Sequence, residues 1–208
     1  SNDNDLVEMP APAPTPAPTP MEYSYEVKVA NLTNAQPLSP LGVTLHGDSK
    51  LWTIGEPASV PLEILAEGGD NSDFISQDEI LVGASSDGII MPGMNATVTI
   101  SSTDENAKYI SLATMLVNTN DAFSGLTGLD LSSFEIDSSK SWVLGAYDSG
   151  TELNTEASGT IPGPADGGTG YSGVRDDTDV VSMHGGVVTM DDGLSSSVLT
   201  QAHRFDNP

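Results

Sequence analysis

Short apolar runs with a period of two recur along most of this chain, and they limit it to an all-β fold. In "YSYEVKVAN", residues 23–31, the apolar Tyr25, Val27 and Val29 alternate with Glu26 and Lys28, which is the pattern of a half-buried strand. Comparable runs occur at 42–46, 50–54, 78–84, 96–101, 109–117, 141–147, 179–185 and 186–190, with Gly, Pro, Asn, Asp and Ser between them. About eight strands separated by turn residues predict an antiparallel β-sandwich.

One stretch, "EPASVPLEILAEGG" at residues 56–69, predicts a short helix. Pro57 suits a first turn, Leu62 and Leu65 lie on one apolar stripe, and Gly68 and Gly69 can end the helix. We expect this helix to cover one end of the sandwich.

The N-terminal stretch differs in composition from the rest. Residues 1–21 alternate Pro with Ala or Thr and contain little to bury, so they predict an extended spacer of polyproline type. The remainder, residues 22–208, is predicted to form one domain. A spacer at this end suggests a lipid tether upstream of it. Residues 150–173 predict a long loop.

The chain is strongly acidic, with 30 Asp and Glu against 6 Lys and Arg and a formal charge of −24. Such a charge disfavours nucleic acid and anionic membrane partners, because both are polyanions. It also supplies many carboxylates for hard cations such as calcium. There is no Cys, which excludes disulfides and thiolate metal sites, and no apolar stretch is long enough for a transmembrane helix.

Motifs for catalysis are lacking, so we expect a protein that is not an enzyme. The sequence has no "GxSxG" elbow, and His46, His184 and His203 lie in no context that indicates a nucleophile. These histidines could bind a transition metal, but hydrogen-bonded structural roles are the commoner outcome. A pair of carboxylates acting on a sugar stays open as an alternative, because their separation is a three-dimensional quantity.

Two loops offer oxygen ligands for calcium. In "VNTNDAF", Asn120 and Asp121, with Asn118 before them, follow a strand that is predicted to be buried. In "GAYDSGTELNT", Asp148 follows another strand, and Gly150 can let the backbone fold Glu152 back toward it. Calcium prefers six to eight oxygens of this kind. The alternative is that both are ordinary turns capped by Asn and Asp.

Several stretches together resemble the spondin domain in its bacterial form. The stretches are "YEVKVANLTNAQPLSP", "IGEPASVPLEILAEGGD", "MLVNTNDAFSGLTGLDL" and "YDSGTELNTEASGTIPGP", which occur in the same order and span about residues 24–207. The resemblance implies a C2-like β-sandwich with a calcium ion held among loops at one end.

Carried across residue by residue, the resemblance implies Asp121, Asp148 and Glu152 as Ca²⁺ ligands. Two positions depart from the family pattern, because Ala122 replaces an aromatic residue and Glu152 replaces an Asp. In the region between residues 122 and 131 we expect Gly125 and Gly128 to turn the chain away from the site.

These observations lead to a functional expectation. We expect an exported, surface-tethered, calcium-binding module whose partner is a protein or polysaccharide at the cell surface. Its expected location is the periplasm, the outer-membrane surface or the outside of the cell. The alternatives are a carbohydrate-active enzyme or sugar-binding domain with an acidic cleft, and a structural surface-layer protein.

Overall fold

A computed structural model describes residues 9–47, 50–175, 177–187 and 189–205 of the chain. Within these ranges the protein is mostly β, with eight strands and one short α-helix. The strands are β1 (Tyr23–Ala30), β2 (Gly42–His46), β3 (Ile80–Ser85), β4 (Asn95–Ser102), β5 (Tyr109–Met115), β6 (Ala122–Asp130), β7 (Ala146–Asp148) and β8 (Ser182–Met183), and the helix is α1 (Val60–Gly68). Four 3₁₀ turns lie at Phe74–Ser76, Leu131–Ser133, Met190–Asp192 and Gln201–His203. None of the described helices is long and apolar enough to cross a membrane.

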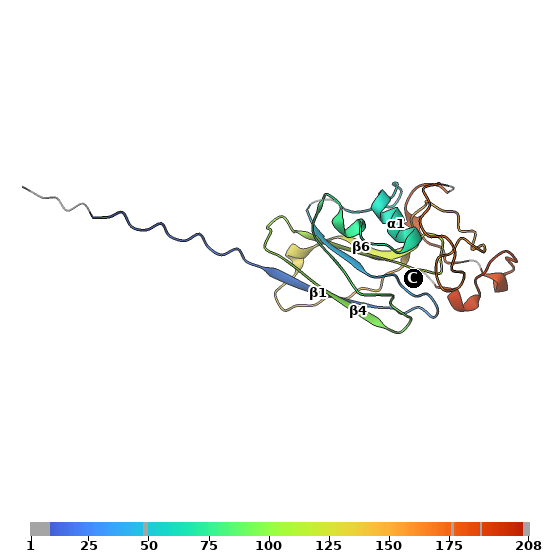
Figure 1. Cartoon of the computed structure of the whole chain (residues 1–208). Coiled ribbons are helices and arrows are strands. Elements are labelled where there is room, and N and C mark those ends of the chain that lie inside the picture. The colour runs from blue at the N-terminus through green and yellow to red at the C-terminus, as the bar shows by residue number, and fades with distance from the viewer. Residues whose placement is uncertain (1–8, 48–49, 176, 188, 206–208) are drawn as a thin grey trace, which may run out of the picture.

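The strands form two antiparallel sheets (Figure 1). The larger sheet has the order β3-β2-β5-β6-β7-β8, and the smaller one contains only β1 and β4. All the strand pairs are antiparallel. The predicted mostly β fold, with antiparallel strands and one helix, is confirmed at this level.

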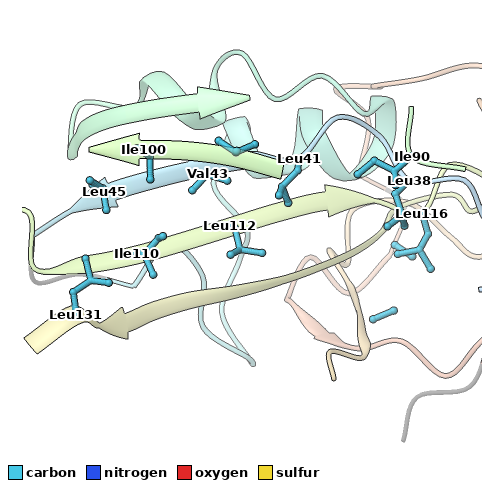
Figure 2. Packing of buried hydrophobic residues seen from close by; sticks show 13 residues of the cluster. Leu38, Leu41, Val43, Leu45, Ile90, Ile100, Ile110, Leu112, Leu116 and Leu131 are labelled. Carbon is cyan, nitrogen blue, oxygen red and sulfur yellow. The ribbon is translucent and has the colours of Figure 1, made fainter. Parts of the chain in front are cut away.

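A hydrophobic cluster joins the two sheets. Val98 and Ile100 of β4 belong to the same buried cluster as Val43 of β2 and Ile110 and Leu112 of β5. Figure 2 shows these side chains, with Ile100 near Leu45 at one end of the cluster and Leu38 near Leu116 at the other. Burial of such side chains contributes roughly 1.5 to 3 kcal/mol each, so this cluster is a main source of stability.

The largest difference from the sequence prediction is β6, which occupies residues that were expected to form a turning loop. Nine residues, Ala122–Asp130, pair with β5 in the centre of the larger sheet. Gly125 lies within the strand, and a Cβ there would meet the carbonyl oxygen of Leu112 at 2.1 Å. Gly128 has a φ of +67° and lies where the register of the β5–β6 pair shifts. The two glycines thus allow close packing and a bulge within a strand, and the prediction that they turn the chain away was wrong.

Some predicted strands are shorter or missing. Residues 50–54 form no strand, although Leu51 and Trp52 are both buried. Residues 141–145 lie outside any strand, and β7 begins at Ala146. Residues 179–185 contain only the two-residue β8. The described residues of 186–190 form no strand, and Val188 lies outside the described residues.

The helix is confirmed, with a later start than expected. Ser59 is its N-cap and accepts a hydrogen bond from the N–H of Leu62, and Pro61, rather than Pro57, lies in the first turn. Gly69 ends the helix in the left-handed conformation at φ 73°. Leu62 and Leu65 are fully buried, so the helix packs on the larger sheet through the predicted stripe.

Residues 9–22 are exposed and have no secondary structure. In Figure 1 they run straight away from the rest of the protein. The other part of the predicted spacer, residues 1–8, lies outside the described residues.

Candidate functional site

The two aspartates of the predicted site are brought together by the β6–β7 strand pair. Asp121 immediately precedes β6, Asp148 is the last residue of β7, and Ala122 is the register partner of Asp148. The N–H of Ser149 donates to the carbonyl oxygen of Asp121 at 3.2 Å. Both side chains are buried, with exposed fractions of 0% for Asp121 and 7% for Asp148.

An aromatic cluster holds these two strands in place. The rings of Phe123 and Tyr147, each one residue inside its strand, are stacked with centroids 5.2 Å apart. Trp52 contacts Phe123 edge to face, with centroids also 5.2 Å apart. Ring pairs of this kind add about 0.5 to 1.5 kcal/mol beyond their buried area. The cluster therefore fixes the backbone from which both aspartates project.

The carboxylate of Asp121 is unevenly hydrogen-bonded. Its Oδ2 atom accepts three hydrogen bonds, from the Ser149 hydroxyl at 3.0 Å and from the N–H groups of Thr151 at 3.0 Å and Glu152 at 3.1 Å. Its Oδ1 atom is buried and has no hydrogen-bond partner among the described residues. A buried polar atom without a partner costs roughly 1 to 3 kcal/mol, and more for a charged group, so the ionised form needs a further positive neighbour.

Asp148 supports the same loop from its other side. One oxygen, Oδ1, accepts from the N–H of Gly150 at 2.7 Å, and the other accepts from the side-chain amide of Asn154 at 2.6 Å. Gly150 has a φ of +77°, as expected from the sequence, since this left-handed conformation folds the 148–152 loop back onto Asp121.

The electrostatics of the pair follow from burial. Burial in the fold, followed by the charge of Asp148, raises the pKa of Asp121 to about 8, although the three donors on Oδ2 act in the opposite direction. The pKa of His184 is lowered by burial, and the charge of Asp148 opposes that shift. Asp121 therefore binds a proton far more readily than an ordinary aspartate does.

The third predicted ligand, Glu152, lies in the same loop, but its carboxylate has other neighbours. Its Oε1 accepts from the side-chain amide of Asn120 at 3.2 Å, and that amide also donates to the Thr160 hydroxyl at 3.0 Å. In the part of the chain that the structure describes, no three His, Asp or Glu side chains are gathered so as to hold a metal. Of the four carboxylate oxygens of Asp121 and Asp148, only Oδ1 of Asp121 has no hydrogen-bond partner among the described residues, and Glu152 is not assembled with the pair.

The side chains of Asn118 and Asn120 form hydrogen bonds with other loops. Asn118 donates to the carbonyl oxygen of Ala35 at 3.1 Å and accepts from the N–H of Ala165 at 2.9 Å. Asn120 accepts from the N–H of Glu156 at 3.2 Å. The long loop predicted at 150–173 is therefore anchored to the turn before β6. The side chains of both asparagines bond to distant loops, and Thr119 makes the local hydrogen bonds of this turn.

Each histidine has a ring nitrogen within hydrogen-bonding distance of a neighbouring group, and Nε2 of the buried His184 has no hydrogen-bond partner among the described residues. His46 Nε2 lies 2.7 Å from the Ser111 hydroxyl, and His203 Nδ1 accepts from the N–H of Thr200 at 3.0 Å. His184 Nδ1 accepts from the N–H of Gly186 at 3.0 Å, so the neutral ring carries its proton on Nε2. In that tautomer Nε2 cannot be a metal ligand, and the structure gives no support to a transition-metal site built on these residues.

Sequence reasoning missed the contacts that connect the site with α1. The Thr151 hydroxyl donates to Glu67 Oε1 at 2.6 Å, and the N–H of Ser172 donates to Glu67 Oε2 at 2.7 Å. Arg175 forms ion pairs with Glu63 and Glu67. The helical spacing of the two glutamates was visible in the sequence, but their partners lie more than eighty positions away, and no local pattern indicates them.

Comparison with known proteins adds no assignment to this geometry. A scan of the chain against models of known protein families gave no match, and a search among curated proteins gave none either.

Proposed function

We propose that this chain is a spondin-like, C2-like β-sandwich that binds calcium at Asp121 and Asp148 and works outside the cytoplasm as a surface-tethered binding module. The observation that carries the proposal is the buried Oδ1 of Asp121, which has no hydrogen-bond partner among the described residues and lies near the charge of Asp148. A divalent cation there would neutralise both carboxylates.

The residues of this chain have defined roles in that proposal. The donors on Asp121 Oδ2 hold the carboxylate in one orientation, which leaves Oδ1 free to meet a ligand. Asp148 supplies the second charge, and Glu152, from the same loop, is the predicted third ligand. Carbonyl oxygens and water would complete the six to eight ligands that calcium prefers.

Tethering is supported by the N-terminal arm. Residues 9–22 are rich in Pro, exposed and without secondary structure, so they can hold a domain away from a surface. Mass spectrometry of the native protein tests this part of the proposal. An acylated or otherwise anchored residue upstream of the arm is the expected result, and an unmodified, unprocessed N-terminus would contradict it.

The alternative of a carbohydrate-active enzyme is weaker at this site. Glycosidases place two carboxyl groups where they reach the substrate, whereas Asp121 and Asp148 are 0% and 7% exposed. The burial of the pair therefore favours an enclosed ion.

Calcium is expected to raise the melting temperature of the full chain. At a calcium concentration about 100 times Kd, the stabilisation is about 2.7 kcal/mol, which corresponds to roughly 5 to 10 °C for a chain of this size. Differential scanning calorimetry in calcium and in chelator measures the shift, and metal analysis of the purified protein identifies the ion.

Two variants make this test specific. Asp148→Asn keeps an oxygen for the N–H of Gly150 but removes the charge, and it is expected to abolish the calcium shift. Glu105→Gln removes an exposed charge and is expected to leave the shift intact. An unchanged melting curve across a chelator titration of the wild-type protein would refute the calcium site.

A further inference from the structure

Strand β1 has an unpaired edge that opens into a large groove. Among the described strands β1 pairs only with β4. The groove measures about 2150 Å³ and is lined by all residues from 21 to 34, whereas no residue of β4 lines it. The groove therefore runs along the edge of β1 that faces away from β4. Its volume exceeds the roughly 300 to 1,000 Å³ of small-molecule pockets, which favours a polypeptide occupant.

The inner wall of this groove is apolar and incompletely covered. Tyr25, Val27 and Val29 of β1 are only partly buried although they pack against the core cluster, and so is Leu126 of β6. Ile100, the register partner of Tyr25 on β4, is 2% exposed. The core is thus closed on the β4 side, and along the other edge of β1 it borders the groove, which residues 134–146 of the same chain also line.

The backbone of β1 indicates which groups the free edge offers. The N–H of Asn31, directly after β1, donates to the carbonyl oxygen of Met94 at 3.0 Å, on the β4 side. Backbone groups alternate in direction along an antiparallel strand. Even-numbered residues, among them Glu26 and Lys28, therefore direct their N–H and C=O groups toward the free edge, where a further strand can bond to them.

The charges on the outer face of β1 select one kind of strand. Glu26 and Lys28 are exposed on either side of Val27, and their register partners on β4 are Thr99 and Thr97. Neither charge takes part in an ion pair of the described residues. A second β1, antiparallel and centred on Val27, places Glu26 opposite Lys28 of the partner subunit and Lys28 opposite Glu26 of the partner subunit.

The registers centred on Glu26 and on Lys28 are less favourable. Centring the pair on Glu26 or on Lys28 places like charges opposite each other, which is destabilising. Centring it on Val27 also places Tyr25 opposite Val29 of the partner subunit, an aromatic and β-branched pair of the stabilising kind. We propose that two copies of this chain form a two-fold symmetric dimer through β1, with a continuous four-stranded sheet β4-β1-β1-β4.

Sedimentation equilibrium of the full chain tests the dimer. The ionic strength should be about 0.15 M, where the Debye length is about 8 Å, because the charge of −24 on each copy causes repulsion at lower salt. The wild-type protein is expected to be a dimer at about 100 μM, the range of a moderate interface. A wild-type protein that stays monomeric at this concentration would overturn the proposal.

Charge reversal tests the register. Glu26→Lys and Lys28→Glu each replace two attractive pairs by two repulsive ones, and each is expected to weaken dimerisation by about tenfold or more. The double variant, Glu26→Lys with Lys28→Glu, restores opposite charges and is expected to restore the dimer. Both substitutions lie on an exposed face, so a melting temperature near that of the wild-type protein serves as the folding control for each of the three variants. A dimer that is indifferent to the single reversals, or that the double reversal fails to restore, contradicts pairing centred on Val27.

Discussion

In the presence of a chelator, the wild-type protein is expected to lose thermal stability relative to the variant Asp121→Asn as the pH rises from about 5 to about 7. The comparison with this variant cancels the contributions of His46 and His184, whose lowered pKa values act in the opposite direction in the same pH range. The pKa of Asp121 in the folded protein is about 8, above the ordinary value of 3.8, so the folded state binds this proton more tightly than the unfolded chain does. Its contribution to stability is fully present below the ordinary pKa and is lost as the pH rises through the folded pKa.

The size of the effect follows from linkage. Between these two pKa values one proton contributes a slope of about 1.4 kcal/mol per pH unit. Two pH units therefore correspond to about 3 kcal/mol, or roughly 5 to 10 °C in melting temperature. Calorimetry at several pH values measures it. A cation at Oδ1 competes with the proton, so saturating calcium is expected to flatten this dependence.

The variant Asp121→Asn isolates the contribution of this group. Asparagine keeps one oxygen to accept the three hydrogen bonds of Oδ2, and it has no charge to titrate. In chelator at pH 8 the variant is expected to melt above the wild-type protein by about 5 to 10 °C, and at pH 5 the two are expected to be closer. It is also expected to show no calcium shift.

Asp73→Asn is the matched control for that variant. Asp73 is exposed, and its side chain makes no capping hydrogen bond, so its amide is expected to reproduce the wild-type pH dependence. A wild-type melting temperature in chelator that changes with pH no more than that of Asp121→Asn would show that the proton of Asp121 is not linked to folding.

The variant Gly150→Ala is expected to destabilise the protein by about 2 to 4 kcal/mol and to abolish the calcium shift. Gly150 has a φ of +77°, and a Cβ there would lie 2.1 Å from the carbonyl oxygen of Val180. The 148–152 loop must then move, and it carries Asp148 and all three donors to Asp121. Thermal denaturation in calcium and in chelator measures both effects.

Gly159→Ala separates the two causes of this destabilisation, which are the left-handed backbone conformation and the contact of a new Cβ with Val180. Gly159 also has a positive φ, of +86°, but a Cβ there would meet nothing within 4 Å. Its cost is expected to be only the left-handed penalty of about 1 to 2 kcal/mol, with the calcium shift retained. Equal losses from both substitutions would mean that contact with Val180 does not fix the loop.

The sequence predicted the strands that carry a clear alternation. β1 begins at the predicted residue, β2 matches its prediction at both ends, and α1 lies within its predicted range. β6 was missed because its two glycines and its Ser and Thr residues imitate a turn in local composition. Their role in close packing against β5 depends on a neighbouring strand, and no local pattern can show it.

The candidate site was also predictable only in part, because some of its contacts depend on distant segments of the chain. Asp148 was predicted to follow a strand, and it ends β7, whereas Asp121 directly precedes β6, a strand that the local composition did not show. The direction of the Glu152 side chain depends on Asn120, and the burial of His184 depends on the C-terminal segments. Both are set by tertiary packing.

The contacts around Asp121 also determine when its site can exist during folding. The carboxylate depends on donors about thirty residues away, and the loop that supplies them is bonded to Glu67 at a separation of 84 residues. Contacts of such sequence separation form slowly, after local structure. The unfolded chain therefore offers no preformed site, and a cation that binds there would stabilise only the completed fold. For an exported protein, this would link the last step of folding to the ion content of the compartment in which the chain arrives.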